Sequence, residues 1–146
     1  MSYRASGNFT SSTFQITPPY PAGMQANDVC LLVVESENQA ISLSSAQGFA
    51  EVPWSPQSAG TAGNNPASRL AVYWKRTVGG DTAPTVADSG DHTTGQIHCF
   101  SGVMTSGNPW DVGAGGNDGG ANDTSGSIPG ATTTVDSTLV VLIIST

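Results

Sequence analysis

Charge is what this sequence has least of, and positive charge above all. Only 10% of its 146 residues are charged, and eleven acids stand against four bases, so the net charge is −7. Binding to nucleic acid requires Lys and Arg to displace counterions from phosphates, and an anionic membrane surface attracts basic segments in the same way. The composition therefore predicts a protein that binds neither nucleic acid nor membrane.

Long apolar runs and helical periodicity are also scarce. The longest apolar run, Leu139–Ile144, is far shorter than the about 20 residues that cross a bilayer as a helix. No stretch of a dozen residues keeps apolar side chains at helical spacing without meeting Gly or Pro. The first residues, Met1–Asn8, contain no apolar core of a secretory signal. We expect almost no helix and one domain over residues 1–146.

Short strand patterns bounded by turn residues are what the chain does contain. Apolar side chains alternate with a period of two in Arg69–Arg76, and the continuous apolar run Asp28–Glu35 is typical of a central strand covered on both faces. In Gln96–Met104 the alternation favours the face of Phe100 as the buried one. The other expected strands are Phe9–Ile16, Ile41–Leu43, Phe49–Trp54, Thr85–Ala87, Ile128–Thr134 and Thr138–Ser145.

Polar, Gly-rich stretches separate these strands. Ser55–Ser68 and Gly113–Gly126 are expected to be exposed loops, the second of them mobile. Roughly seven to nine short strands without helical spacers predict an all-β protein, an antiparallel β-sandwich similar to a jelly roll. The last and most apolar strand stops at Thr146 with no turn after it. Two interpretations stay open: a central strand at the terminus, or a domain whose C-terminal strands are missing.

The chain has only two cysteines, Cys30 and Cys99, and each lies in an expected strand. A free cysteine packs as a small hydrophobe. A disulfide needs the two strands to be neighbours with suitable geometry, which spacing does not reveal. We therefore expect two free thiols, as in other proteins made in a reducing cytoplasm.

No catalytic constellation stands out. His92 lies in a turn-like stretch and is expected to be solvated, whereas His98 and Cys99 are neighbours on a strand and point to opposite faces. A Cys–His pair formed across strands stays open as an alternative. Carboxylates for glycoside hydrolysis would have to come from Glu35, Glu37, Glu51 or the loop aspartates, and their spacing fixes no separation. We expect a protein that is not an enzyme, with no catalytic, cofactor-binding or metal-binding residues.

Two patterns nevertheless suggest ligands. Oxygen-bearing side chains in the Gly-rich loop could wrap a calcium ion: Asp111, Asn117, Asp118, Asn122 and Asp123. They lack the regular spacing of a calcium loop, so a flexible connector is the favoured interpretation. Five aromatic residues could include a platform on which a sugar stacks: Trp54, Trp74, Trp110, Tyr20 and Tyr73. Core and corner positions in a sandwich are the favoured interpretation for them.

Several strand and turn segments look familiar when they are taken in order. They are Met1–Gly7, Pro21–Glu35, Leu70–Arg76, Ala83–His92 and Ser106–Val112. Together they resemble a group of tailed-bacteriophage virion proteins, and the resemblance spans nearly the whole chain. It consists of strand and turn patterns and carries over no active-site residue.

This resemblance implies a structural component of a virion that is assembled in the host cytoplasm. Its place would be the tail tip, fibre or baseplate, or the capsid surface, and its partners would be other virion proteins and further copies of itself. The alternative hypothesis is a carbohydrate-binding module that recognises a host-surface glycan through exposed tryptophans.

Overall fold

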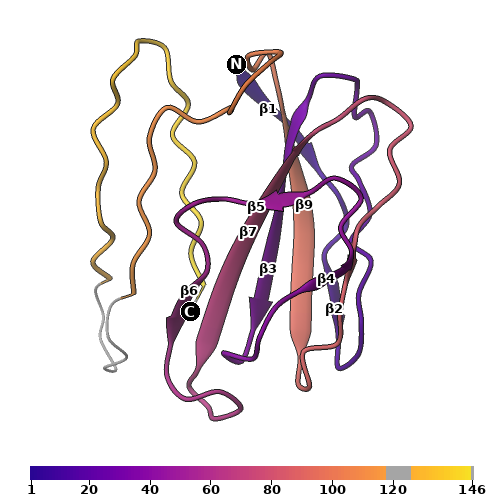
Figure 1. Ribbon diagram of the computed structural model, residues 1–146, viewed down its shortest axis with the longest axis vertical. Coiled ribbons are helices and arrows are strands. Elements are labelled where there is room, and N and C mark those ends of the chain that lie inside the picture. The colour runs from indigo at the N-terminus through magenta and orange to yellow at the C-terminus, as the bar shows by residue number, and fades with distance from the viewer. Residues whose placement is uncertain (118–125, 146) are drawn as a thin grey trace.

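The computed structural model of the protein describes residues 1–117 and 126–145 (Figure 1). Within these residues all regular secondary structure is β-strand, and no helix is present that could cross a membrane. The strands are β1 (Ser2–Ser6), β2 (Thr10–Ser12), β3 (Val29–Ser36), β4 (Leu43–Ser45), β5 (Ala50–Glu51), β6 (Gln57–Ala59), β7 (Ser68–Arg76), β8 (Thr85–Val86) and β9 (Thr93–Ser101).

One large antiparallel sheet dominates the molecule. Its strand order is β1-β9-β3-β7-β5, with β2 also pairing with β9 and β6 with β7, while β4 and β8 form a small second sheet. The long strands β9, β3 and β7 lie at the centre, and β3 pairs along its whole length with both neighbours. The predicted all-β, antiparallel, sandwich-like fold is confirmed.

The main core lies on one face of the large sheet, which we call the inner face. Buried side chains alternate along β3, as expected from the period of two in a strand. Ile16, Phe49 and Val86 cover this face from the second layer. Gly95 on β9 permits this contact, because a Cβ there would stand 2.9 Å from Cδ1 of Ile16. The inner-face residues of the core are Cys30, Leu32, Val34, Ala71, Tyr73, Ile97 and Cys99.

The opposite, outer face of the large sheet also presents apolar side chains, but they are only partly buried. They include Leu31, Val33, Leu70, Val72 and Trp74. Residues 105–117 and 126–145 pass over this face in extended loops, seen as the orange to yellow trace beside the sheet in Figure 1. We call these two stretches the outer layer.

Two predicted strands in the outer layer are wrong. Ile128–Thr134 and Thr138–Ser145 contain no assigned strand. Within the described residues no backbone ladder joins them to the large sheet. They pass over its face, and a cavity lies between Leu139–Ile144 and the sheet. Apolar composition alone did not produce a paired strand, because a strand also needs a partner.

Other predicted boundaries shift in ways that pairing explains. Phe9–Ile16 contains only the short β2 and an isolated bridge from Ile16 to Val86. The predicted loop Ser55–Ser68 holds β6, which pairs with β7. β1 was not expected at all, since it has no apolar alternation and owes its form to pairing with β9.

The expected buried face of β9 must also be corrected. Ile97 and Cys99 are fully buried in the main core. Phe100, on the opposite face, is buried too, but in a smaller cluster with Val29 and Val103. The C-terminal half of β9 is therefore covered on both sides, so its alternation gave an ambiguous signal.

The prediction of two free thiols is contradicted. Cys30 and Cys99 form a disulfide, and no free cysteine remains. The two residues are directly opposite one another on β3 and β9, with their Cα atoms 4.1 Å apart. Spacing along the chain could not reveal this register, because it depends on which strands become neighbours.

Candidate functional site

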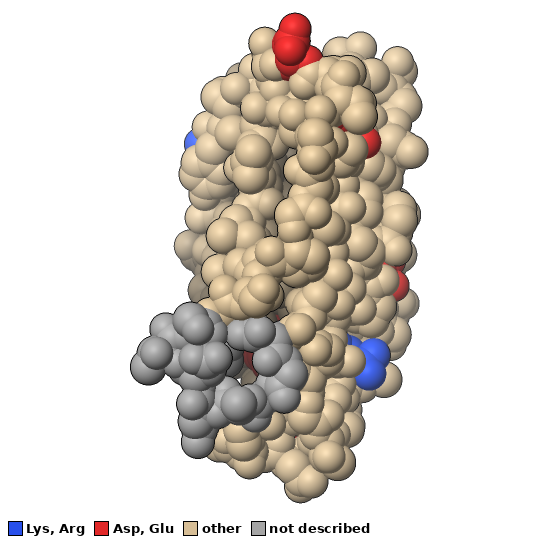
Figure 2. Space-filling model, turned by 90° about the vertical axis from the view of Figure 1, so that its left-hand side faces the viewer, with Lys and Arg blue, Asp and Glu red and all other residues tan. Residues whose placement is uncertain are grey.

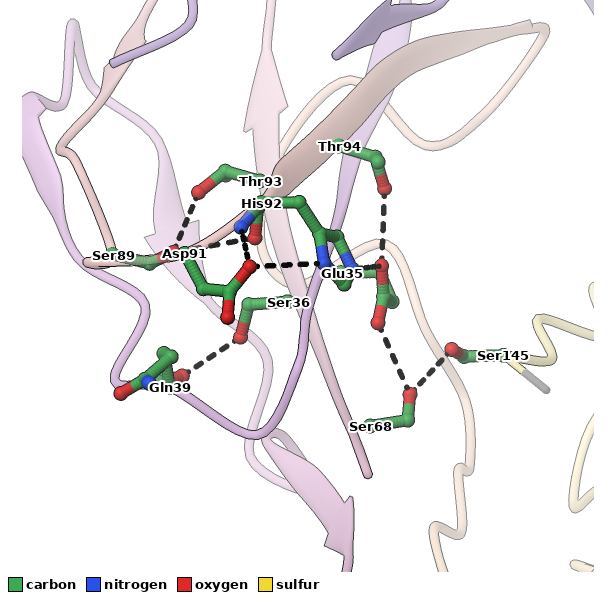
Figure 3. A network of polar contacts seen from close by, with 10 residues as sticks. All are labelled: Glu35, Ser36, Gln39, Ser68, Ser89, Asp91, His92, Thr93, Thr94 and Ser145. Carbon is green, nitrogen blue, oxygen red and sulfur yellow. Dashed lines mark hydrogen bonds and ion pairs between the residues drawn. The ribbon is translucent and has the colours of Figure 1, made fainter. Parts of the chain in front are cut away.

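A group of titratable side chains lies where β3 ends and β9 begins, within a network of polar contacts (Figure 3). Because these strands are antiparallel and Ser36 is opposite Thr93, residues just after β3 meet residues just before β9. Glu37 is thereby brought to Asp91 and His92. Together with Glu35 of β3, these residues form what we call the carboxylate–histidine cluster.

Glu35 fixes the imidazole of His92. His92 Nε2 lies 3.2 Å from Oε2 of Glu35, and Thr94 Oγ1 lies 3.4 Å from the same oxygen. An ionised carboxylate only accepts hydrogen bonds, so Nε2 carries the proton and donates it. In a neutral ring the Nδ1 lone pair then faces Asp91, whose Oδ1 is 3.6 Å away.

The side chains of Glu37 and Asp91 are joined by a hydrogen bond. A hydrogen bond between their side chains raises the pKa of Glu37, with partial burial adding to the effect. The pKa of Asp91 is lowered, first by the backbone N–H of His92, 2.6 Å away, and then by the bond from Glu37. Two carboxylates this close share a proton or require a cation.

The cluster has the donor set of a metal site. Glu37, Asp91 and His92 each offer one ligand atom, and these atoms lie within 4.8 Å of one another. Carboxylate oxygens combined with an imidazole nitrogen suit divalent transition ions. Within the described residues, this is the one group of three or more His, Cys, Asp or Glu side chains with such spacing.

A short chain of hydroxyl groups connects the cluster to the outer layer. Ser68 Oγ donates to Oε1 of Glu35 over 3.4 Å, and Ser68 Oγ and Ser145 Oγ are 2.6 Å apart (Figure 3). Glu35 therefore contacts His92 on one side and, through Ser68, the end of the outer layer on the other.

A cavity separates the outer layer from the sheet. Its volume is about 560 Å³, and its walls include Leu31 and Phe100 of the sheet and the run Leu139–Ile144. The exposed fraction along that run alternates: 40% for Leu139, 80% for Val140, 45% for Val141, 61% for Leu142 and 60% for Ile144. One apolar face of this run is directed at the sheet, and an equally apolar face is directed away from it.

The three tryptophans come together, but the two tyrosines do not join them. The ring of Trp110 makes edge-to-face contacts with Trp54 and Trp74, at centroid distances of 5.5 and 5.1 Å. Tyr73 lies in the main core instead, where burial raises its pKa to about 12. Tyr20 stacks on Phe49, also on the inner face.

Only two of the five candidate calcium ligands, Asp111 and Asn117, lie within the residues that the structure describes. The carboxylate of Asp111 accepts hydrogen bonds from the side-chain hydroxyl of Thr134 and from the backbone of Thr134 and Val135, which together lower its pKa. The side-chain amide of Asn117 donates to the carbonyl of Ser58. The remaining candidates lie outside the described residues: Asp118, Asn122 and Asp123. Asp111 thus closes a turn within the outer layer.

The structure also places the candidate catalytic residues. Cys99 is in a disulfide, so the alternative of a Cys–His pair has no thiol to use. His98 points to the outer face, where burial lowers its pKa. Glu51 accepts a hydrogen bond from Ser55 over 2.8 Å and is not part of the cluster. Sequence reasoning missed the role of His92, because its partners come from a distant strand.

Comparisons with known proteins give no match: no family model, no curated protein and no solved structure matches the chain.

Proposed function

We propose that the protein is a structural module of a bacteriophage virion, a non-catalytic assembly component of the tail tip, fibre or baseplate, or of the capsid surface. It associates with copies of itself and with other virion proteins. The resemblance of its strand and turn segments to tailed-bacteriophage virion proteins supports a phage origin. The observation that carries the assembly role is the nearly uncharged outer layer with its exposed apolar run Leu139–Ile144.

The outer layer has the chemistry of an interface rather than of a solvated surface. Its described residues, 105–117 and 126–145, include only two charged side chains, Asp111 and Asp136. Figure 2 views the molecule from this side and shows a surface almost free of Lys, Arg, Asp and Glu. The exposed face of Leu139–Ile144 adds a contiguous apolar strip. Soluble monomers rarely leave such patches uncovered.

Burial of this strip would favour association. Removing a Val, Leu or Ile side chain from water is worth roughly 1.5–3 kcal/mol, and Val140, Leu142 and Ile144 all remain more than half exposed. The strip carries no charge, so its burial brings no like charges into contact, and association has to overcome only the longer-range repulsion between chains of net charge −7.

Mass spectrometry of purified virions tests the proposal. The protein is expected in intact particles at a fixed ratio to the other structural proteins. Its absence from particles, when it is present in the infected cell, would contradict a virion role.

The alternative is a carbohydrate-binding module that recognises a host-surface glycan. The clustering of Trp54, Trp74 and Trp110 favours it, because Trp54 and Trp110 line a wider hollow of about 1720 Å³ beside the outer layer. A sugar would have to stack on an indole face that the neighbouring rings leave open.

A glycan array followed by titration of tryptophan fluorescence separates the two functions. A glycan-binding module gives a saturable change in fluorescence that Trp54→Ala abolishes, whereas a purely structural module gives no saturable response.

A further inference from the structure

We propose that Glu37, Asp91 and His92 bind a divalent transition-metal ion, with zinc as the ion that their chemistry fits best. None of these ligands belongs to the outer layer, which reaches the cluster only through Ser145 and Ser68, so the site does not depend on the assembly role. Its ligands come from the two chain segments that meet at the end of β3 and the start of β9.

The geometry needs only a small closing movement. The three ligand atoms lie within 4.8 Å of one another, whereas ligands around a tetrahedral zinc at about 2.0–2.2 Å are roughly 3.3 Å apart. The side chain of Asp91 is 38% exposed, so it has room to move toward the imidazole that Glu35 holds. Exposure also leaves room for water as the fourth ligand.

The imidazole is held as a metal ligand should be. Metal-binding histidines usually donate the second ring N–H to a carboxylate, which fixes the tautomer and aims the other nitrogen at the ion. Glu35, which is not one of the three ligands, accepts from Nε2 of His92. Nδ1 is therefore the nitrogen that is directed at Asp91, with no hydrogen-bond partner closer than 3.6 Å.

The charge balance independently favours a cation. Glu35, Glu37 and Asp91 bring three carboxyl groups together around one imidazole. Three of the four bases contact groups elsewhere: Arg4 pairs with Asp28, Lys75 pairs with Asp81 and Arg76 donates to the carbonyl of Gly107. Arg69 of β7 lies opposite Ser36, beside the cluster, but it donates to Asn38 and forms no ion pair with a carboxylate of the cluster. No Lys or Arg of the chain neutralises the cluster, and a bound dication would.

A bound ion would also connect structural elements. Glu37 follows β3, while Asp91 and His92 precede β9. The ion would close the ends of the two central strands, so it should raise the melting temperature of the folded protein.

Titration calorimetry with ZnCl₂ near neutral pH, on the whole chain, tests the site. The expected result is saturable binding of one zinc ion per chain. His92→Ala and Asp91→Asn should each weaken binding at least about 10-fold, and Glu35→Ala should weaken it about 10- to 100-fold by releasing the imidazole. His98→Ala is the matched control, because it removes the other histidine, and it should bind zinc as wild type does.

Two further readouts make the result decisive. The Co²⁺-loaded protein should show an absorption spectrum typical of a site with a nitrogen ligand, and the nitrogen-ligand feature should be absent in His92→Ala. MgCl₂ should compete poorly with zinc for the site, because magnesium prefers an all-oxygen site. Circular dichroism confirms that each variant is folded. Absence of saturable zinc binding by wild type would overturn the proposal, as would zinc binding that His92→Ala leaves unchanged or that His98→Ala abolishes.

Discussion

At the scale of single residues, the disulfide is the feature that most changes the expected chemistry. Cys30 and Cys99 close a loop of 69 residues, and a cross-link of that size lowers the entropy of the unfolded chain by the equivalent of about 4 kcal/mol. Disulfides persist where the surroundings are oxidising, which includes the surface of a released particle.

Thiol titration of unfolded, unreduced protein should therefore find no free thiol. The double variant Cys30→Ala/Cys99→Ala should lose about 4 kcal/mol of unfolding free energy in urea, and reduced wild type should lose a similar amount. Two free thiols in protein from oxidising conditions would contradict the pairing of β3 and β9 at this register.

The ion pair of Lys75 and Asp81 gives a pH dependence. Burial alone would raise the pKa of Asp81, but the hydrogen bonds from Lys75 and from the backbone of Val78 and Gly79 outweigh it and lower that pKa. A carboxyl whose pKa is lower in the folded state stabilises the fold above its unfolded pKa. This stabilisation is lost as the pH falls through the folded pKa.

Asp81→Asn should accordingly reduce the unfolding free energy by about 2 kcal/mol near neutral pH. The difference from wild type should close in acid, below the ordinary pKa of aspartate. Urea unfolding at a series of pH values measures both. A difference that is independent of pH would show that the charge of Asp81 is not what stabilises the fold.

At the scale of elements, the sequence predicted the long central strands and the positions of β5 and β8, but it missed β1 and β6. β3, β7 and β9 carry long apolar patterns, because they form the centre of the large sheet. β1 has five residues and β6 has three, and they pair with β9 and β7 respectively. Such short strands are selected by the partner that they meet and not by their own composition.

The candidate cluster escaped prediction for the same reason. Glu37 and Asp91 become neighbours only through the register of β3 with β9. Neither local spacing nor residue type indicates that register. His92 alone is typical of a solvated turn, and only Glu35 and Asp91 together give it a different environment.

The packing of the outer layer onto the tryptophans is specific at Gly113. A Cβ at this position would stand 2.2 Å from Cζ2 of Trp54, so Gly113→Ala must displace either the indole or the chain. The expected cost is about 1–3 kcal/mol of unfolding free energy, as for other overpacked sites, with a shift in tryptophan fluorescence.

Gly130→Ala is the matched control, because it lies in the same layer with no atom within 4 Å of the added Cβ. It should leave both stability and fluorescence unchanged. Equal behaviour of the two variants would show that residues near Gly113 do not rest on Trp54 in solution.

At the scale of the whole molecule, the distribution of polarity separates two surfaces. The inner face of the sheet is covered within the chain and holds the main core. Within the outer layer, the run Leu139–Ile144 is apolar on both of its sides, and only one side faces the chain's own sheet. A fold with one completed core and one uncovered apolar side is well suited to assembly.

The oligomeric state in solution is therefore expected to depend on the outer layer. Leu142, 61% exposed, lies on the outward side of that layer, and Phe14, 68% exposed, lies near β2, away from it. Leu142→Asp places a charge in the proposed interface, where its burial without a partner would be costly, and it should convert an oligomer to monomers. Phe14→Asp makes the same chemical change at similar exposure and should leave the oligomer intact.

Size-exclusion chromatography with light scattering measures the mass of each species. Wild type that stays monomeric at high concentration, or an oligomer that tolerates Leu142→Asp and not Phe14→Asp, would show that the outer layer is not the surface through which copies of the chain associate.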